Sequence, residues 1–151
     1  MAQTTTARNA CSCAVWLDNS SGTLKDISGS STSVEFGFTN EIGEFVTFGS
    51  CYKGRLECGK DWTFTLNVVY STTSDEGWDI LKGWMHNTTC SDDPRTLDIY
   101  VPTKNVGSDY WTMEVYLASL SFTADRSDAN PIMVTAEFLP DGTVTHSVAG
   151  T

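Results

Sequence analysis

The sequence has little positive charge and few histidines. Its 151 residues include nine Lys and Arg, nineteen Asp and Glu, and two His, which gives a formal net charge of −10. Stable nucleic-acid binding depends on basic side chains that displace the counterions of the phosphates, so this balance argues against it. The length fits a single domain, residues 1–151.

The sequence also lacks a long apolar run. Residues 1–22, MAQTTTARNACSCAVWLDNSSG, contain one Arg and no apolar stretch of signal-peptide length, and no other segment is apolar for long enough to cross a bilayer. We therefore expect a protein that is made and kept in a cytoplasm and has no membrane partner. The sequons at Asn19 and Asn87 need a secretory route that nothing else supports, so we interpret them as chance matches.

Five cysteines are present, without the spacing of a disulfide framework or a zinc knuckle. Cys11 and Cys13 form a C-x-C pair, Cys51 and Cys58 flank a glycine-containing loop, and Cys90 stands apart. An odd number argues against a secreted disulfide scaffold, and no pair has the C-x2-C spacing typical of zinc. A zinc site that gathers these thiols is the weaker alternative, and we expect free thiols, no metal and no cofactor.

No constellation of residues points to catalysis. His86 and His146 have no nucleophile or acid arranged near them in the sequence, as a catalytic triad would require. Asp75, Glu76 and Asp79 are explained by the start of a helix, where acidic side chains are favourable. The sequence therefore predicts that the protein is not an enzyme.

What the sequence does contain is alternation of apolar and polar residues, which is typical of strands. In residues 59–70, GKDWTFTLNVVY, one face is large and apolar: Trp62, Phe64, Leu66, Val68 and Tyr70. The other face carries short uncharged residues, Thr63, Thr65, Asn67 and Val69, where an exposed strand usually has Lys or Glu. Residues 32–38, 97–101, 111–122 and 132–139 alternate in the same way, and turn residues separate them. Residues 13–17 and 143–148 are weaker candidates for edge strands, and residues 1–23 are interpreted as an N-terminal arm or edge strand.

One segment, residues 73–87, has helical spacing instead. Thr73 and Glu76 stand at the spacing of a capping box, and apolar residues follow at helical intervals. These are Trp78, Leu81, Trp84 and Met85. Two glycines weaken the helix, so we expect its stability to come from packing of the tryptophan-rich face on a sheet.

Residues 39–59 contain four glycines and a broken alternation, and form either a loose hairpin or a binding arm. The length of the segment predicts more than a simple hairpin. Its apolar side chains are more than a solvated loop needs, so they predict a partner surface: Ile42, Phe45, Val46, Phe48, Tyr52 and Leu56. We expect the arm to be mobile in an isolated subunit and ordered on another copy.

The order of these pieces resembles the major tail tube protein of long-tailed bacteriophages. The resemblance covers about residues 24–145 and rests on DISGSSTSVEF (26–36), TFGS (47–50), GKDWTFTLNVVY (59–70), GWDILKGW (77–84), MEVYLASLSFTA (113–124) and PIMVTAEFLPDGTV (131–144). It implies a two-sheet antiparallel β-sandwich with one flanking helix, whose strands form a ring-shaped barrel when six copies assemble. It further implies stacked hexameric rings in a virion tail, assembly in the host cytoplasm, and contacts with the tail tip, tape measure and terminator proteins.

If the sheet lines such a ring, its polar face would look into a channel through which DNA passes without specific binding. The expected lumen-facing residues are Ser33, Glu35, Thr63, Thr65, Asn67, Glu114, Thr135 and Glu137. An ordinary solvated sheet face is the simpler alternative.

Two other functions stay open. A monomeric β-sandwich that binds carbohydrate or peptide would use aromatic residues at loop ends: Trp16, Tyr52, Tyr110 and Trp111. A small hydrolase is the weaker alternative, because no convincing pair of nucleophile and base is present.

Overall fold

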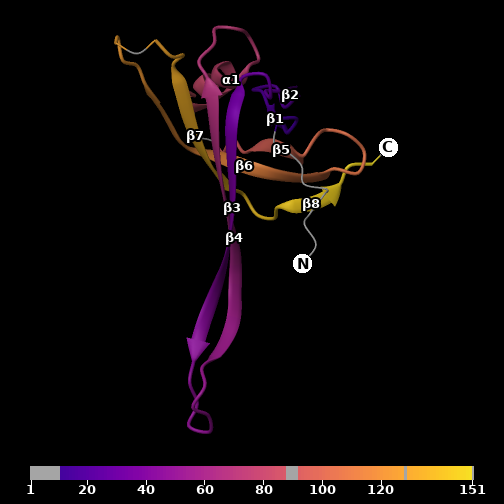
Figure 1. Cartoon of the computed structure of the whole chain (residues 1–151), viewed down its shortest axis with the longest axis vertical. Helices are drawn as coiled ribbons and strands as arrows, with labels where there is room; N and C mark the ends of the chain where they lie inside the picture. Colours follow the sequence, from indigo (N-terminus) through magenta and orange to yellow (C-terminus); the bar gives the residue numbers. More distant parts are fainter. Residues whose placement is uncertain (1–10, 88–91, 128, 151) are drawn as a thin grey trace, which may run out of the picture.

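The chain folds into one antiparallel sheet and one short helix (Figure 1). The computed structural model describes residues 11–87, 92–127 and 129–150. The elements are β1 (Ala14–Asp18), β2 (Leu24–Asp26), β3 (Ser31–Phe45), β4 (Gly54–Val69), α1 (Gly77–Met85), β5 (Arg95–Val101), β6 (Asp109–Thr123), β7 (Met133–Pro140) and β8 (Thr145–Val148). The predicted mainly β fold with a single helix is confirmed. Within the described ranges, no helix has the length and apolar character needed to cross a membrane.

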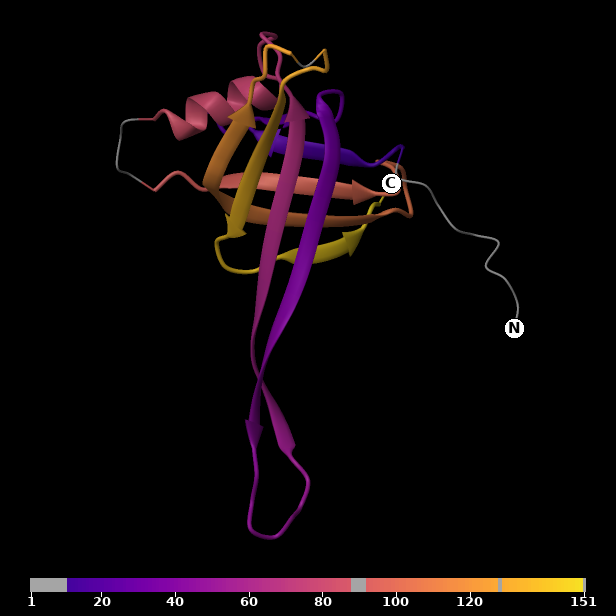
Figure 2. The same cartoon turned by 60° about the vertical axis from the view of Figure 1, so that its left-hand side comes forward.

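Strand β6 belongs to both halves of the sheet. Residues 109–115 pair with β5, and residues 115–123 pair with β7. The sheet runs in the order β2-β1-β5-β6-β7-β4-β3, and β8 pairs with the first part of β6. Figure 2 shows β3, β4 and β7 passing in front of β1, β5 and β6, so the two halves face one another.

The prediction of two separate sheets is therefore not confirmed. The structure has a single sheet that stays open, with β2 and β3 at its ends, and it bends through β6. A register shift between Leu117 and Ser119 marks an irregularity in β6, of the kind that bends a strand and increases its twist. The sequence of residues 111–122 marks the same point, because its apolar residues lie at odd positions up to 117 and at even positions from 118 to 122.

The core lies between the two halves. Phe64, Leu66 and Val68 of β4 are buried there, as their alternation predicts, while Trp62 is half-buried and Tyr70 is exposed. The opposite half contributes the buried residues Val15, Leu17, Leu97, Ile99 and Met113. Both halves thus bury one face and leave the other face outside.

The N-terminal edge strand is corrected by the structure. Strand β1 lies inside the sheet, because β5 pairs with one side of it and β2 with the other. Strand β2 has only three residues, Leu24, Lys25 and Asp26, and such a short and partly charged strand leaves little signal in the sequence. Residues 1–10 of the predicted N-terminal arm lie outside the described residues. Strand β8 pairs only with β6, so the predicted C-terminal edge strand is confirmed.

Helix α1 packs its apolar face on β4, β6 and β7. Trp78, Leu81 and Trp84 are buried, as predicted, and Met85 is 39% exposed. The Trp78 ring meets Phe122 at 5.8 Å between centroids, and the Trp84 ring meets Phe138 at 5.9 Å. Packing against the sheet, rather than propensity, therefore stabilises this short helix.

The predicted capping box is wrong. The helix begins at Gly77 with Glu76 at the N-cap position, and Glu76 makes no side-chain cap hydrogen bond. The Gly77 N–H instead donates to Ser30 Oγ at 3.2 Å, so a distant residue satisfies one of the free amides of the first turn. A Cβ at Gly77 would stand 2.9 Å from Cγ1 of Val68, so this glycine allows the helix to approach β4 closely.

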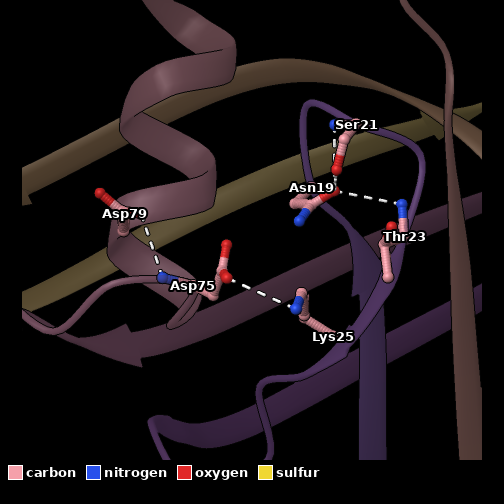
Figure 3. Close-up of polar contacts among 6 residues, drawn as sticks. All are labelled: Asn19, Ser21, Thr23, Lys25, Asp75 and Asp79. Atoms are coloured by element: carbon pink, nitrogen blue, oxygen red, sulfur yellow. Dashed lines mark hydrogen bonds and ion pairs between the residues drawn. The ribbon is translucent and has the colours of Figure 1, made fainter.

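The segment that leads into α1 is tied to β2, next to the β1–β2 turn (Figure 3). Lys25 Nζ lies 3.5 Å from Asp75 Oδ2, and the Asp75 N–H donates to Asp79 Oδ2 at 3.1 Å. In the turn itself, Asn19 Oδ1 accepts hydrogen bonds from the backbone of Ser21 and Thr23. The acids near the helix start thus have structural partners.

We expect Trp84→Ala to reduce the free energy of unfolding by about 3–5 kcal/mol, the usual cost of emptying a large buried aromatic site. The variant also loses two specific contacts of the Trp84 side chain. These are the hydrogen bond from Nε1–H to the Asp93 carbonyl at 3.0 Å and the contact with the Arg95 guanidinium, 4.7 Å from the ring centroid. Urea unfolding measures the change, and Met85→Ala, on the exposed side of the same helix, is the matched control. An unchanged midpoint for Trp84→Ala would show that the core assignment is wrong.

Candidate functional site

The arm predicted at residues 39–59 is the outer part of the β3–β4 hairpin. Strands β3 and β4 stay paired as far as Phe45 and Gly54, with one bulge on the way. Only residues 46–53 therefore form a loop. Figures 1 and 2 show this hairpin extending far beyond the body of the domain. The expectation of a segment too long for a simple hairpin is thus wrong, whereas the description as an arm fits.

A β-bulge explains why the sequence pattern looked broken. Glu41 pairs with Gly59 and Ile42 with Glu57, which leaves Cys58 as an extra residue on β4. An extra residue shifts the phase of alternation by one, so side chains of β4 before and after Cys58 follow opposite parity. The segment is a regular strand on both sides of the bulge.

The six predicted interface residues are all exposed, but they do not share one face. The exposed fractions are 51% for Ile42, 46% for Phe45, 64% for Val46, 115% for Phe48, 85% for Tyr52 and 62% for Leu56. The register puts Phe45 and Leu56 on the side opposite Ile42, and the other three lie in the loop. The arm therefore presents apolar groups around its whole tip.

Local contacts fix the end of the arm. Glu44 accepts from Lys53 Nζ at 2.9 Å and from Arg55 Nε at 3.4 Å. The Phe45 ring lies across Gly54, where a Cβ would stand 2.3 Å from it. These contacts place the charged side chains just behind the loop.

The outward face of β3, β4, β7 and the second part of β6 carries a polar patch, with Met133 and Leu139 exposed beyond it on the same face. The register aligns Ser33, Asn67 and Thr135 in one row, and Glu35, Thr65 and Glu137 in the next. Asn67 Nδ2 donates to Ser33 Oγ and Thr135 Oγ1 donates to Asn67 Oδ1, both at 2.7 Å. Thr63 belongs to the same face opposite Gly37. The structure thus brings seven of the eight predicted lumen-facing residues together.

Two further residues of this polar face were not predicted from the sequence. Ser119 pairs with Glu137 and Ser121 with Thr135, and Ser119 Oγ donates to Glu137 Oε2 at 3.2 Å. The irregularity between Leu117 and Ser119 changes the phase of β6, and the sequence carries a signal for it, because the apolar residues change from odd numbers up to Leu117 to even numbers from Ala118 onward. No Lys or Arg occurs in the four strand segments of this face, residues 31–41, 61–69, 116–123 and 133–140.

The eighth predicted residue, Glu114, lies elsewhere. It pairs with Thr96 of β5, and Thr96 Oγ1 donates to its Oε1. This position is on the outward face of the other half of the sheet, which also carries Trp16 and Tyr110. Glu114 is therefore separate from the row that contains Glu35 and Glu137.

The outward face around Glu114 is aromatic and acidic, and it also carries the hydroxyls of Thr96 and Thr112. Lys104 Nζ lies 3.4 Å from the centroid of the Trp16 ring, next to the buried Asp98. Burial raises the pKa of the Asp98 carboxyl, and the negative charges of Asp18 and Glu114 raise it further. A hydrogen bond with Thr112 and the positive charge of Lys104 lower this pKa in part. The two outward faces of the sheet thus differ in chemistry.

The aromatic residues proposed for a carbohydrate or peptide site do not converge. Trp16 and Tyr110 lie on the face just described, Trp111 lies on the core side against Phe36, and Tyr52 is in the arm loop. This arrangement gives no observation in favour of the binding-module alternative.

The histidines and cysteines form no cluster that points to chemistry. His146 Nε2 lies 2.8 Å from Asp109 Oδ1, and His86 is the C-cap of α1. Cys51 and Cys58 lie on the arm, and Cys90 falls outside the described residues. Among the residues that the structure describes, no three His, Cys, Asp or Glu could hold a metal ion together.

Solved structures with the same fold come from tubes and tails. No family model matches the sequence, and no curated protein matches it. A chain in the virion of a native gene transfer agent particle is 9% identical with a TM-score of 0.72, over 93% of this chain and 99% of that one. A chain of the anti-feeding prophage baseplate is 12% identical with a TM-score of 0.75, over 96% and 97%. The SPP1 tail tube protein is 9% identical with a TM-score of 0.68, over 95% and 79%. The resemblance to tail tube proteins is thus confirmed for the fold.

We expect the arm to exchange its amide hydrogens faster than β7 in the free subunit. No residue of 41–57 belongs to the buried core, and a paired but uncovered hairpin opens locally at low free-energy cost. Hydrogen exchange read by mass spectrometry compares peptides from residues 41–57 with peptides from residues 133–140. Protection of the arm equal to that of β7 would contradict the predicted mobility and indicate a rigid hairpin.

Proposed function

We propose that this chain is a structural tail tube protein, copies of which form six-membered rings that stack into a hollow tube for genome delivery. The observation that carries the proposal is that this chain and chains of tail structures share their fold over nearly the whole length of both. One of the structures with this fold is the tail of an empty gene transfer agent particle with C6 symmetry, of which 99% is covered by the present chain. Identity with it is 12%, so the shared architecture rather than shared residues supports the role.

The open sheet suits such an assembly. Strand β3 is at the end of the sheet and has fifteen residues, so its outer edge offers a long row of backbone groups to a neighbour. A ring in which each subunit extends the sheet of the next would use this edge and close the sheets into a barrel. The protein would then be located in the virion tail after assembly in the host cytoplasm, with tail tip, tape measure and terminator proteins as partners.

The polar face is the part of the subunit best suited to line the channel. Its hydroxyl and amide groups come from Ser33, Thr63, Thr65, Asn67 and Thr135. Asn67 is hydrogen-bonded to both Ser33 and Thr135. Glu35 and Glu137 add negative charge, and the absence of Lys and Arg from the strand segments of this face, residues 31–41, 61–69, 116–123 and 133–140, removes the contacts that would hold phosphates. DNA would pass such a wall without specific binding. Glu114 is left out of this wall because it lies on the other half of the sheet.

Replacing Glu35 and Glu137 by Lys tests the lumenal position. Both side chains are exposed, so we expect a change in stability of about 0.5 kcal/mol or less and normal tube assembly. In a phage that carries the double variant, new lysines on the channel wall would attract phosphates and slow DNA ejection, most strongly at low salt. Glu114→Lys makes the same charge change on the other half and should eject normally. Normal ejection by the double variant at low salt would count against the lumenal assignment.

Deleting residues 41–57 and bridging the strands with a short Gly-Ser turn tests the role of the arm. The core cluster contains no residue of the deleted segment, so we expect a folded and soluble protein. Negative-stain images of the purified full chain should show rings or tubes, whereas the deletion variant should remain monomeric. Tubes formed by the deletion variant would refute the role of the arm, and a full chain that stays monomeric at every concentration would refute the proposed function.

A further inference from the structure

The core of the subunit is open on the side opposite α1. A groove of about 480 Å³ lies there between the two halves of the sheet. Its lining includes Val15 of β1, Phe36 and Phe38 of β3, Ile99 and Val101 of β5, and Trp111 of β6. Figure 2 shows α1 at one side of the body and the end of β5 at the other, so the helix covers only one end of the core.

This groove is uncharged, and its lining combines apolar side chains with two cysteines and the hydroxyls of Ser28, Ser31, Thr32 and Ser33. Val15 and Ile99 belong to the core and are each 3% exposed, but Phe38 is 54% exposed. The aromatic side chains of the lining contact one another, with 4.5 Å between the centroids of Phe36 and Phe38 and 5.8 Å between those of Phe36 and Trp111. No residue that lines the groove carries a charge. Its volume is within the roughly 300–1,000 Å³ range of pockets that bury a ligand.

The tip of the arm has matching chemistry. Residues 45–52, FVTFGSCY, are eight consecutive residues without a charge in a chain whose net charge is −10. Phe48 is fully exposed, and Val46 and Tyr52 are largely exposed. Exposed aromatic side chains of this kind bury a large apolar area when they find a pocket.

One chain cannot join its own tip to its own groove. The β3–β4 hairpin carries the tip to the far end of the molecule, away from the body that holds the groove (Figures 1 and 2). The hairpin is paired from Ser31 to Phe45, so it does not fold back. A tip that enters a groove must therefore enter the groove of a second copy.

We propose that the arm tip of one copy inserts Val46 and Phe48 into the groove between the sheet halves of another copy. This inference rests on the proposed function and names the surface that the arm meets. Copies that each carry a charge of −10 repel one another, and a contact between two uncharged surfaces buries apolar area without placing like charges together. The insertion would cover the end of the core that α1 leaves open.

Two native cysteines report on this contact. Cys51 lies in the tip, and Cys13 lines the groove. A full-length variant that keeps these two and replaces Cys11, Cys58 and Cys90 by Ser is assembled and treated with a short bismaleimide. We expect covalent multimers on denaturing gels, and their loss when either Cys13 or Cys51 is also replaced by Ser. Mass spectrometry of crosslinked wild-type tubes identifies the same Cys13–Cys51 peptide pair without dependence on the folding of a variant.

A matched variant keeps Cys13 and Cys58 instead. Cys58 is also exposed on the arm, but it lies at the bulge rather than in the tip, so we expect at least a tenfold lower yield of multimers. In addition, Phe48→Ser should abolish the Cys13–Cys51 link, because it removes the inserted ring from an exposed position that is not needed for folding.

The outcomes separate the two proposals. Tubes that form without a Cys13–Cys51 link, or that link Cys13 equally to Cys58, would overturn the insertion and leave the tail tube function standing. A full chain that forms no rings, no tubes and no multimers would overturn both. Protection of Cys13 from the reagent while Cys51 stays reactive would also overturn the insertion. It would show that the groove holds another occupant, such as residues 1–10 of the same chain or a different part of a ring neighbour.

Discussion

The sharing of β6 between the two halves of the sheet is the constraint on which the rest of the structure depends. Because residues 109–115 pair with β5 and residues 115–123 with β7, one strand holds both halves and sets the space between them. Each half then buries its inner face against the other, and the core needs no second sheet. The same bend gives the protein two outward faces of different chemistry, one hydroxylated and one aromatic and acidic.

A core enclosed by a bent open sheet has two open ends, and the residues that the structure describes cover only one of them. Helix α1 brings Trp78, Leu81 and Trp84 to one end, and its close approach depends on Gly77 next to Val68. At the other end Phe38 and Val101 stay exposed. In the proposed assembly, another copy would cover this end of the core.

The arm and the polar face would divide the work of such an assembly between two kinds of surface. The arm carries apolar side chains on a paired hairpin that the body does not cover, so its contacts are available to another copy. The polar face satisfies many of its hydrogen bonds internally, as the row Ser33, Asn67 and Thr135 illustrates, and therefore offers little to bind. In the proposed tube, the first surface holds copies together and the second lets DNA pass.

The sequence by itself determined the strands, the buried face of β4 and the tryptophan-rich face of α1, because alternation and helical spacing follow directly from backbone geometry. It also placed seven residues of the polar face correctly on one surface, since strands with intact alternation keep their parity. Only the tertiary structure decided what irregularities did to this pattern. The bulge at Cys58 turned an apparent loop into a hairpin, and the shift beyond Leu117 added Ser119 and Ser121 to the polar face. The pairing of residues 109–115 with β5 keeps Glu114 apart from this face. The cap of α1 was decided in the same way, because Ser30 lies 47 positions before Gly77 and only folding brings its hydroxyl to that amide.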